Sequence, residues 1–383
     1  MHRLLTGGGA PIMGHVPEPD NADPAPDGRS DPVRLDAVRT MAGSGATLSG
    51  EHVMAMGNSP TGAPAGRNVS LDVGRYLLLT GVIALHLLGS VPPDRLGLWS
   101  IAVSNMTHVA VPVFLLVAGY FLAWPSRSYR DCITRPLVRL LPLHLFWLGI
   151  YIVFYWITIG FAWEWTAQIL INGGPAYHLW FLPALLIALI VVAVASKAVG
   201  LRGALLVCAI PAAIGLSTGA LHDLLGLPGT AQRGGILMAP IFVWLGAAMR
   251  VFAPDRIDRR LVWLAVATLL IVQGMENAMF SRMAAGHVMT VRAFPLTMFA
   301  TAVAVFLAIR SIPASLWPRW LVEQSRCTLG VYAVHLLVIY SIGGRIVPTG
   351  PGSLALVVAI VFVLSSLIAR GMTLIAPLRR FVI

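Results

Sequence analysis

The sequence predicts an all-α fold, a polytopic membrane helix bundle of about ten transmembrane helices with both termini in the cytoplasm. The 383 residues are 57% hydrophobic and only 11% charged, about half the charged share of a typical soluble domain. Apolar stretches of nearly spanning length recur from Leu71 to the C-terminus. A backbone that crosses lipid in such stretches must be helical, because unpaired amides find no water there. The third observation is an uneven distribution of Lys and Arg between alternate loops.

Residues 1–70 differ in composition from the rest of the chain. They are rich in Pro, Gly, Asp and Ala, and they hold five Arg and seven acidic residues. No positively charged stretch followed by an apolar core indicates a secretory signal. We therefore expect a disordered cytoplasmic tail over 1–70 and a transmembrane domain over 71–383. An alternative is that the true initiator is Met54 or Met56.

Ten apolar segments follow, and each is expected to form one transmembrane helix. Pro142, Pro211 and Pro240 lie inside three of them and suggest kinks whose freed backbone groups neighbouring helices satisfy. The expected cores are Leu71–Val91, Ile101–Trp124, Leu137–Ile159, Leu179–Ser196, Ala204–Leu221, Ile236–Met249, Leu261–Met279, Ala293–Ile309, Leu329–Val347 and Leu354–Ala369.

The distribution of basic residues indicates how these segments are oriented in the membrane. The loops after the second, fourth, sixth and eighth segments, together with the C-terminal end, hold fifteen Lys and Arg, and the opposite loops hold five. Positive charge marks the cytoplasmic side, which predicts cytoplasmic termini. The basic residues behind the net charge of +11 are distributed over the short loops between membrane segments. This pattern is typical of topology signals, so no nucleic-acid partner is expected. The three cysteines show no disulfide or zinc spacing, and no metal site is predicted.

The first segment carries the most informative pair of polar residues, Arg75 and His86. Eleven steps of about 100° return a helical side chain to within roughly 20° of its start, about 16 Å further along the axis. Both side chains therefore share one face, with Arg75 near the cytoplasmic surface and His86 near the middle of the membrane. Ionisable groups at that depth are costly and are candidates for function.

Each member of this pair has two interpretations. A neutral His86 can act as a general base that takes a proton from a hydroxyl, or it can be a buried histidine bonded to a backbone carbonyl or a neighbouring helix. Arg75 can hold an anionic ligand, or it can pair with Asp72 three residues earlier.

A cationic strip opens the third segment and includes Arg130, Arg135 and Arg139. Guanidinium forks bind phosphate well, so with Arg75 the strip is expected to form a pocket for a phosphorylated cytoplasmic ligand. The alternative is topology and contact with lipid headgroups.

Three further groups are weaker candidates. His178 and Trp180 open the fourth segment from the outer side, and Tyr332 and His335 lie three residues apart on one face of the ninth. Glu276 ends the seventh segment on the outer side, where its carboxylate can accept a hydrogen bond from a sugar hydroxyl or simply reach water.

These residues together resemble the acyltransferase-3 family of bacterial membrane acyltransferases, over Asp72 to about His335. The most specific element is the Arg-x10-His pattern of Arg75 and His86. The other motifs are Phe-x4-Gly-Tyr at Phe114–Tyr120, His-x-Trp-Phe-Leu at His178–Leu182 and Leu-Gly-x-Tyr-x-x-His at Leu329–His335. Two positions depart from the family, Ala118 where Ser is frequent and an Arg135-x3-Arg139 spacing where the family has Arg-x-x-Arg.

The resemblance implies ten helices, a cytoplasmic acyl-CoA donor and an extracytoplasmic acceptor hydroxyl, usually of a carbohydrate. It implies that His86 is catalytic and Arg75 a donor contact. We place Arg135, Arg139, Tyr332 and His335 on the donor side, and His178, Trp180 and Glu276 on the acceptor side. Acetyl-CoA is the favoured donor, no permanently bound cofactor is expected, and the sequence assigns no oligomeric state.

The expected location is the bacterial inner (cytoplasmic) membrane, where the protein crosses the lipid bilayer several times. His86 is expected to deprotonate the acceptor for direct transfer, with a covalent acyl-histidine as the alternative. A secondary transporter or exporter is the competing class. The sequence shows neither an inverted repeat nor the paired broken helices that build midplane substrate sites.

Overall fold

The structure is a computed structural model, and every regular element in its described residues is helical. The chain divides into two units, Met1–Arg67 and Asn68–Ile383. The expected tail falls almost entirely in the first unit, which lies outside the described residues, so its disorder remains a prediction. The described residues are 68–89, 91, 98–122, 127–160, 174–219, 221–225, 231–252, 258–283, 294–342 and 348–383.

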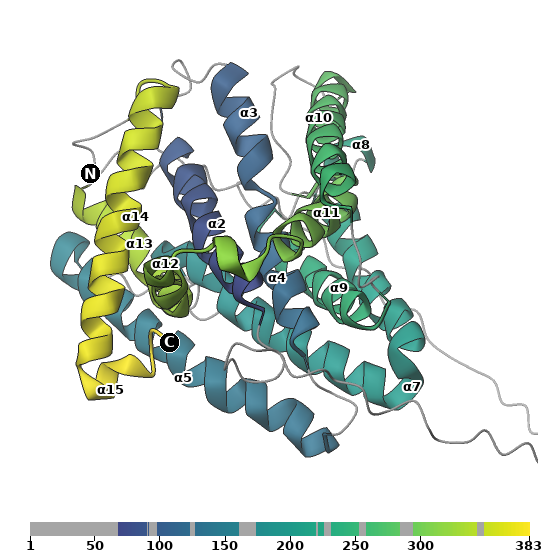
Figure 1. Cartoon of the computed structure of the whole chain (residues 1–383), viewed down its shortest axis with the longest axis horizontal. Coiled ribbons are helices and arrows are strands. Elements are labelled where there is room, and N and C mark those ends of the chain that lie inside the picture. The colour runs from purple at the N-terminus through teal and green to yellow at the C-terminus, as the bar shows by residue number, and fades with distance from the viewer. Residues whose placement is uncertain are drawn as a thin grey trace, which may run out of the picture. The chain divides into compact units, whose positions relative to one another are not determined.

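The helices occur in the order that the apolar segments predict (Figure 1). The longer ones are α2 (Val69–Leu88), α3 (Leu98–Thr107), α4 (Ala110–Tyr120), α5 (Tyr129–Ile159), α7 (Phe181–Thr218), α9 (Ala231–Phe252), α10 (Arg259–Met283), α11 (Met298–Arg310), α13 (Thr328–Ile342) and α14 (Pro351–Leu374). The short ones are η2 (Gly174–Trp180), α8 (His222–Leu225), η3 (Ala314–Leu316), α12 (Arg319–Gln324), η4 (Ser325–Cys327) and α15 (Ala376–Arg379).

The all-helical, multiply spanning prediction is confirmed. Eight stretches of the described chain are helices long and apolar enough to cross a membrane. The expected number was about ten, and two features explain the difference. The fourth and fifth segments merge in α7, whose two halves meet at Gly200, where φ is +74°, a left-handed conformation that favours glycine. The eighth segment is α11, an apolar helix of only 13 residues.

Local sequence accounts for where several helices begin. The Asn68 side chain caps α2 by accepting a hydrogen bond from the Leu71 amide at 3.0 Å, and Ser128 caps α5 by accepting one from the Asp131 amide. Such caps satisfy amides that have no partner inside the first turn. The prolines expected to kink the bundle lie within α5, α7 and α9, and these helices continue through them.

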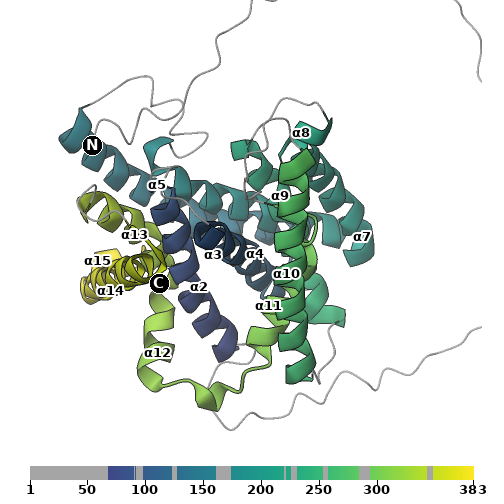
Figure 2. The same ribbon diagram turned by 90° about the horizontal axis from the view of Figure 1, so that it is seen from above.

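Helix α2 lies between α13 and α14 on one side and α4 and α11 on the other (Figures 1 and 2). Its Gly74 meets Ile309 of α11 so closely that an added Cβ would lie 2.4 Å from the isoleucine Cγ2. More than half of the α2 residues are buried by these neighbours, whereas Arg75 and His86 are partly exposed.

Helices α4 and α9 cross at two glycines. A Cβ added at Gly119 would lie 1.9 Å from the carbonyl oxygen of Val243, and one added at Gly246 would lie 1.9 Å from that of Leu116. The two backbones therefore touch, as small residues allow between membrane helices. Gly119 belongs to one of the four family-like motifs, and its visible role is this crossing.

Side-chain contacts join the ends of α2, α4, α9 and α11. The Ser70 hydroxyl near the start of α2 donates to the Ile312 carbonyl just after α11. Arg310 at the end of α11 lies over the Tyr120 ring at the end of α4, and Arg250 of α9 donates to the Tyr120 carbonyl. These basic ends are those that the charge count assigns to the cytoplasm. The sidedness itself, and the location of both termini, remain predictions.

Gly119→Ala should therefore destabilise the protein, because the new methyl group must push α4 and α9 apart. Overpacking of this kind costs about 1–3 kcal/mol. We expect a lower melting temperature in detergent, followed by tryptophan fluorescence or by retention on size exclusion after heating. Gly149→Ala is the matched control, since an added Cβ on α5 meets nothing within 4 Å. Equal melting of the two variants would contradict a backbone contact at Gly119.

Candidate active site

His86 lies in the last turn of α2 and is partly exposed. Its Nδ1 is 2.9 Å from the Tyr177 hydroxyl oxygen, and Tyr177 comes from η2. The His86 ring stacks on the ring of His335 of α13, with 5.2 Å between centroids, and meets His178 edge-on at 6.2 Å. Three segments that lie far apart in the sequence thus bring three imidazoles together.

His178 is held in place through both its ring and its backbone. Its side chain is 2% exposed and packs against the Tyr151 ring at 5.0 Å. Its carbonyl accepts a hydrogen bond from the Tyr332 hydroxyl. The irregular η2 segment is therefore attached to α5 and α13 next to His86, and this attachment positions the neighbouring Tyr177.

His335 is the most deeply placed of the three, at 1% exposure. Its Nδ1 contacts the Tyr332 carbonyl one helical turn earlier. A carbonyl oxygen only accepts hydrogen bonds, so Nδ1 carries the proton and Nε2 is the bare acceptor nitrogen. That Nε2 is buried and has no hydrogen-bond partner among the described residues.

The cluster has an accessible side and a buried side. Tyr177 is 41% exposed and His86 partly exposed, whereas His178 and His335 are buried. A histidine that a substrate can reach, whose ring is oriented by a hydroxyl and by a second imidazole, suits general-base chemistry. Among the described residues, no group of three or more His, Cys, Asp or Glu side chains is arranged to hold a metal ion.

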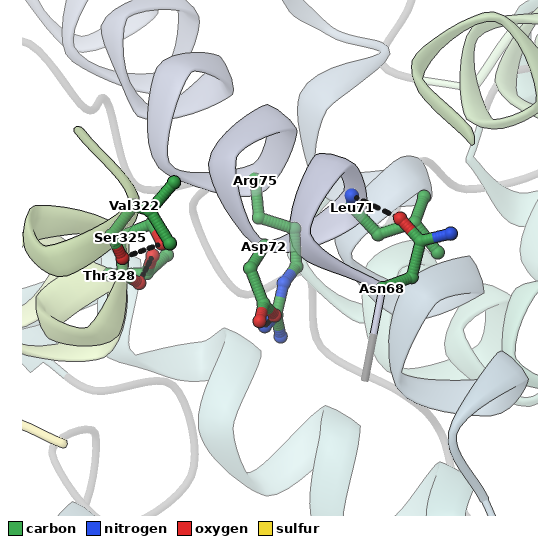
Figure 3. Close-up of polar contacts among 7 residues, drawn as sticks. All are labelled: Asn68, Leu71, Asp72, Arg75, Val322, Ser325 and Thr328. Atoms are coloured by element: carbon green, nitrogen blue, oxygen red, sulfur yellow. Dashed lines mark hydrogen bonds and ion pairs between the residues drawn. The ribbon is translucent and has the colours of Figure 1, made fainter. Parts of the chain in front are cut away.

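Arg75 forms the ion pair that one interpretation of the sequence anticipated. Its Nη2 lies 2.6 Å from Asp72 Oδ1, and Figure 3 shows the two side chains turned toward one another on the first turns of α2. The Nε of Arg75 is buried and makes no hydrogen bond within the described residues. The ion pair thus uses only part of the guanidinium, and a donor contact at Arg75 remains a prediction.

Arg135 and Arg139 lie exposed on α5, and Arg135 is 3.6 Å from Asp131. Helix α5 packs mainly against α7 and η2, whereas α2 packs against α3, α4, α11, α13 and α14. The contacts of the described residues therefore do not bring this strip to Arg75. Donor binding by Arg135 and Arg139 remains a prediction.

Two candidates on the acceptor side have visible structural partners. The Trp180 ring packs over Gly235 of α9, where an added Cβ would lie 2.6 Å from it. The Glu276 carboxylate accepts hydrogen bonds from the amides of Leu296 and Thr297 and from the Thr297 hydroxyl. Glu276 thus caps the start of α11, where a negative charge is also favoured by the helix dipole. Contact of either residue with a sugar remains a prediction.

Tyr177 and Tyr151 are not among the site residues expected from the sequence. For Tyr177 a signal was present, because it directly precedes His178 in the motif at the start of the fourth segment. Tyr151 offered none. Its hydroxyl donates to the Ala333 carbonyl and accepts from the Leu337 amide, and such contacts between distant helices cannot be read from spacing.

Comparison with protein families matches residues 68–370 to the family model described as an acyltransferase domain. That range includes His86, His178 and His335. Comparisons with curated proteins and with solved structures gave no significant match.

Glu276→Ala should destabilise the α10–α11 region, because three donors lose their shared acceptor. The loss of a cap and its charged hydrogen bonds is worth about 1–2 kcal/mol. We expect a lower melting temperature and faster hydrogen exchange over 296–300. Glu323→Ala is the control, since Glu323 is exposed and makes no hydrogen bond or ion pair within the described chain. An unchanged melting temperature for Glu276→Ala would contradict the capping role.

Proposed function

Because the chain belongs to the acyltransferase-3 family, and is a multi-pass membrane acyltransferase, we propose that it carries an acyl group from cytoplasmic acyl-CoA to an extracytoplasmic hydroxyl. Acetyl is the favoured group, and the hydroxyl is that of a cell-envelope or exported carbohydrate. The observation that carries the proposal is the accessible His86, backed by two buried histidines and oriented by Tyr177. The location is the bacterial inner membrane.

His86 acts as the general base in this proposal. In the tautomer that this role requires, His86 Nδ1–H donates to the Tyr177 hydroxyl oxygen, and Nε2 carries the lone pair that removes the proton from the acceptor hydroxyl. The acceptor oxygen then attacks the thioester carbonyl, the carbon–sulfur bond breaks, and the CoA thiolate takes the proton from the imidazolium. One ester is formed and one thioester is consumed, without an oxidant or a further reactant.

The length of α2 fits a donor and an acceptor that arrive from opposite sides. Arg75 and His86 are separated by about 16 Å along the helix axis, a distance that the extended pantetheine arm of CoA spans. The nucleotide end of the donor then lies near the basic helix ends, and its thioester lies beside His86. His335 stacks on His86, and Tyr332 lies next to His335; in this proposal both contact the donor, and His178 and Trp180 contact the acceptor.

His86→Gln should abolish transfer, since a general base contributes roughly a hundredfold to ten-thousandfold to a rate. The measurement is incorporation of radiolabelled acetyl from acetyl-CoA into envelope carbohydrate by membranes that hold equal amounts of protein. His144→Gln is the control, because His144 lies on α5 outside the histidine cluster. Wild-type labelling by His86→Gln would sink the assignment. Donor-independent transport of a carbohydrate would favour an exporter instead.

Tyr177→Phe should lower kcat roughly tenfold and leave the KM for acetyl-CoA unchanged, because one hydrogen bond that orients the base is lost. A purely structural role would also lower the melting temperature, so both quantities are measured. Tyr129→Phe, at the start of α5 and beside Lys197, removes a hydroxyl away from the cluster and should change neither. A normal kcat in Tyr177→Phe would show that the hydrogen bond to His86 is dispensable.

A further inference from the structure

Residues 380–383, which we call the C-terminal segment, pack against the bundle after α15. The Phe381 carbonyl accepts a hydrogen bond from the Trp147 indole N–H of α5 at 3.0 Å. The Val382 carbonyl accepts one from the Gly330 amide of α13 at 3.2 Å, and the Val382 side chain is fully buried. The segment follows the range that the family model matches, so its contacts are a feature of this chain outside the matched domain.

Two apolar contacts add to these hydrogen bonds. The Phe381 ring stacks on Phe146 of α5, with 4.0 Å between ring centroids and 7° between the planes. Gly330 leaves the space that Val382 occupies, since a Cβ added at Gly330 would lie 2.7 Å from the Val382 Cβ. The C-terminal segment therefore holds α5 with one residue and α13 with the next.

The C-terminal segment bridges two helices that have mainly different neighbours. Helix α5 packs mainly against α7 and η2, and α13 packs mainly against α14 and α2. A second link between α5 and α13 lies one turn beyond Trp147, where the Tyr151 hydroxyl donates to the Ala333 carbonyl. Residues four apart share one face of a helix, so the segment and Tyr151 are successive levels of one bridge.

This bridge ends at the histidine cluster. Tyr332, two residues after Gly330, donates a hydrogen bond from its hydroxyl to the His178 carbonyl. The Tyr151 ring packs against the His178 ring at 5.0 Å, and His178 meets His335 edge-on at 5.1 Å. A shift of α5 against α13 would therefore move the rings that surround the proposed base.

We propose that the C-terminal segment is a positioning element of the active site, which holds α5 to α13 and thereby keeps the two buried histidines against His86. This inference rests on the proposed function and adds Phe381 and Val382 as positioning residues. Neither residue contacts the reacting atoms. Their effect passes through Trp147 and Gly330, so it should appear in the rate of the chemical step and not in binding of the donor.

Phe381→Ala should lower kcat for acetyl transfer roughly tenfold to a hundredfold, because small displacements at a reacting centre cost this much. The KM for acetyl-CoA should stay unchanged. Ile383→Ala, which shortens the exposed neighbouring side chain, is the matched control. Val266→Ala destabilises a separate apolar cluster of α10 and α11. Rates are taken per folded molecule below every melting temperature, and an equal fall in kcat for Phe381→Ala and Val266→Ala would overturn the proposal.

Gly330→Ala tests the contact with Val382 directly. The added methyl group should displace the C-terminal segment and lower kcat as Phe381→Ala does. Val382→Gly removes both Val382 atoms that the new Cβ would meet, at 2.7 and 2.8 Å. The double variant Gly330→Ala/Val382→Gly should therefore recover most of the kcat that Gly330→Ala loses. A double variant no more active than Gly330→Ala would show that the segment does not act through this contact.

A measurement that needs no catalysis separates this proposal from the proposed function. Diethyl pyrocarbonate modifies accessible imidazoles, and mass spectrometry locates the products. His178 and His335 are 2% and 1% exposed, so both should react slowly in the wild type and several-fold faster in Phe381→Ala. Faster modification in a protein without acetyl transfer would retain the positioning role and reject the enzyme. Normal kcat and unchanged modification in Phe381→Ala would retain the enzyme and reject the positioning role.

Discussion

The constraint on which this structure depends is that a chain crossing lipid must satisfy its polar groups within the protein. The side-chain N–H groups between α3 and α10 obey it: Gln273 and Asn277 donate to Asn105, and Asn105 donates to the Leu270 carbonyl. Glu276 obeys it at the start of α11. These partners hold α10, most of whose surface is exposed, to the rest of the bundle.

Several buried polar atoms of the described residues have no hydrogen-bond partner and so break this rule. Two groups of these atoms lie near the two ends of α2. Arg75 and Arg310 have unpartnered nitrogens near its start, and His178 and His335 near its end. The remaining cases are spread over other helices, at His144, Ser196, Gln273, Gln324 and Ser365. Buried polar atoms without a partner therefore lie near both ends of α2.

Close backbone packing is what allows α2 to carry this arrangement. Gly74 lets α11 approach α2, and Gly119 and Gly246 let α4 and α9 touch. Larger side chains at these positions would push α11 away from α2 and α4 away from α9. Gly119, which belongs to a family-like motif, thus sets the distance between α4 and α9.

The sequence alone determined the class of this protein: all-helical, multiply spanning, with Arg75 and His86 on one helical face and motifs that resemble a family later matched over 68–370. These features depend on composition, helical period and order along the chain, which are local properties. Tertiary structure decided which residues meet. Only folding brings Tyr177 to His86, gives Glu276 to α11, and leaves Arg135 exposed and Arg310 Nη1 without a hydrogen-bond acceptor. Contacts between distant helices depend on how their backbones pack, and no spacing within one segment records that packing.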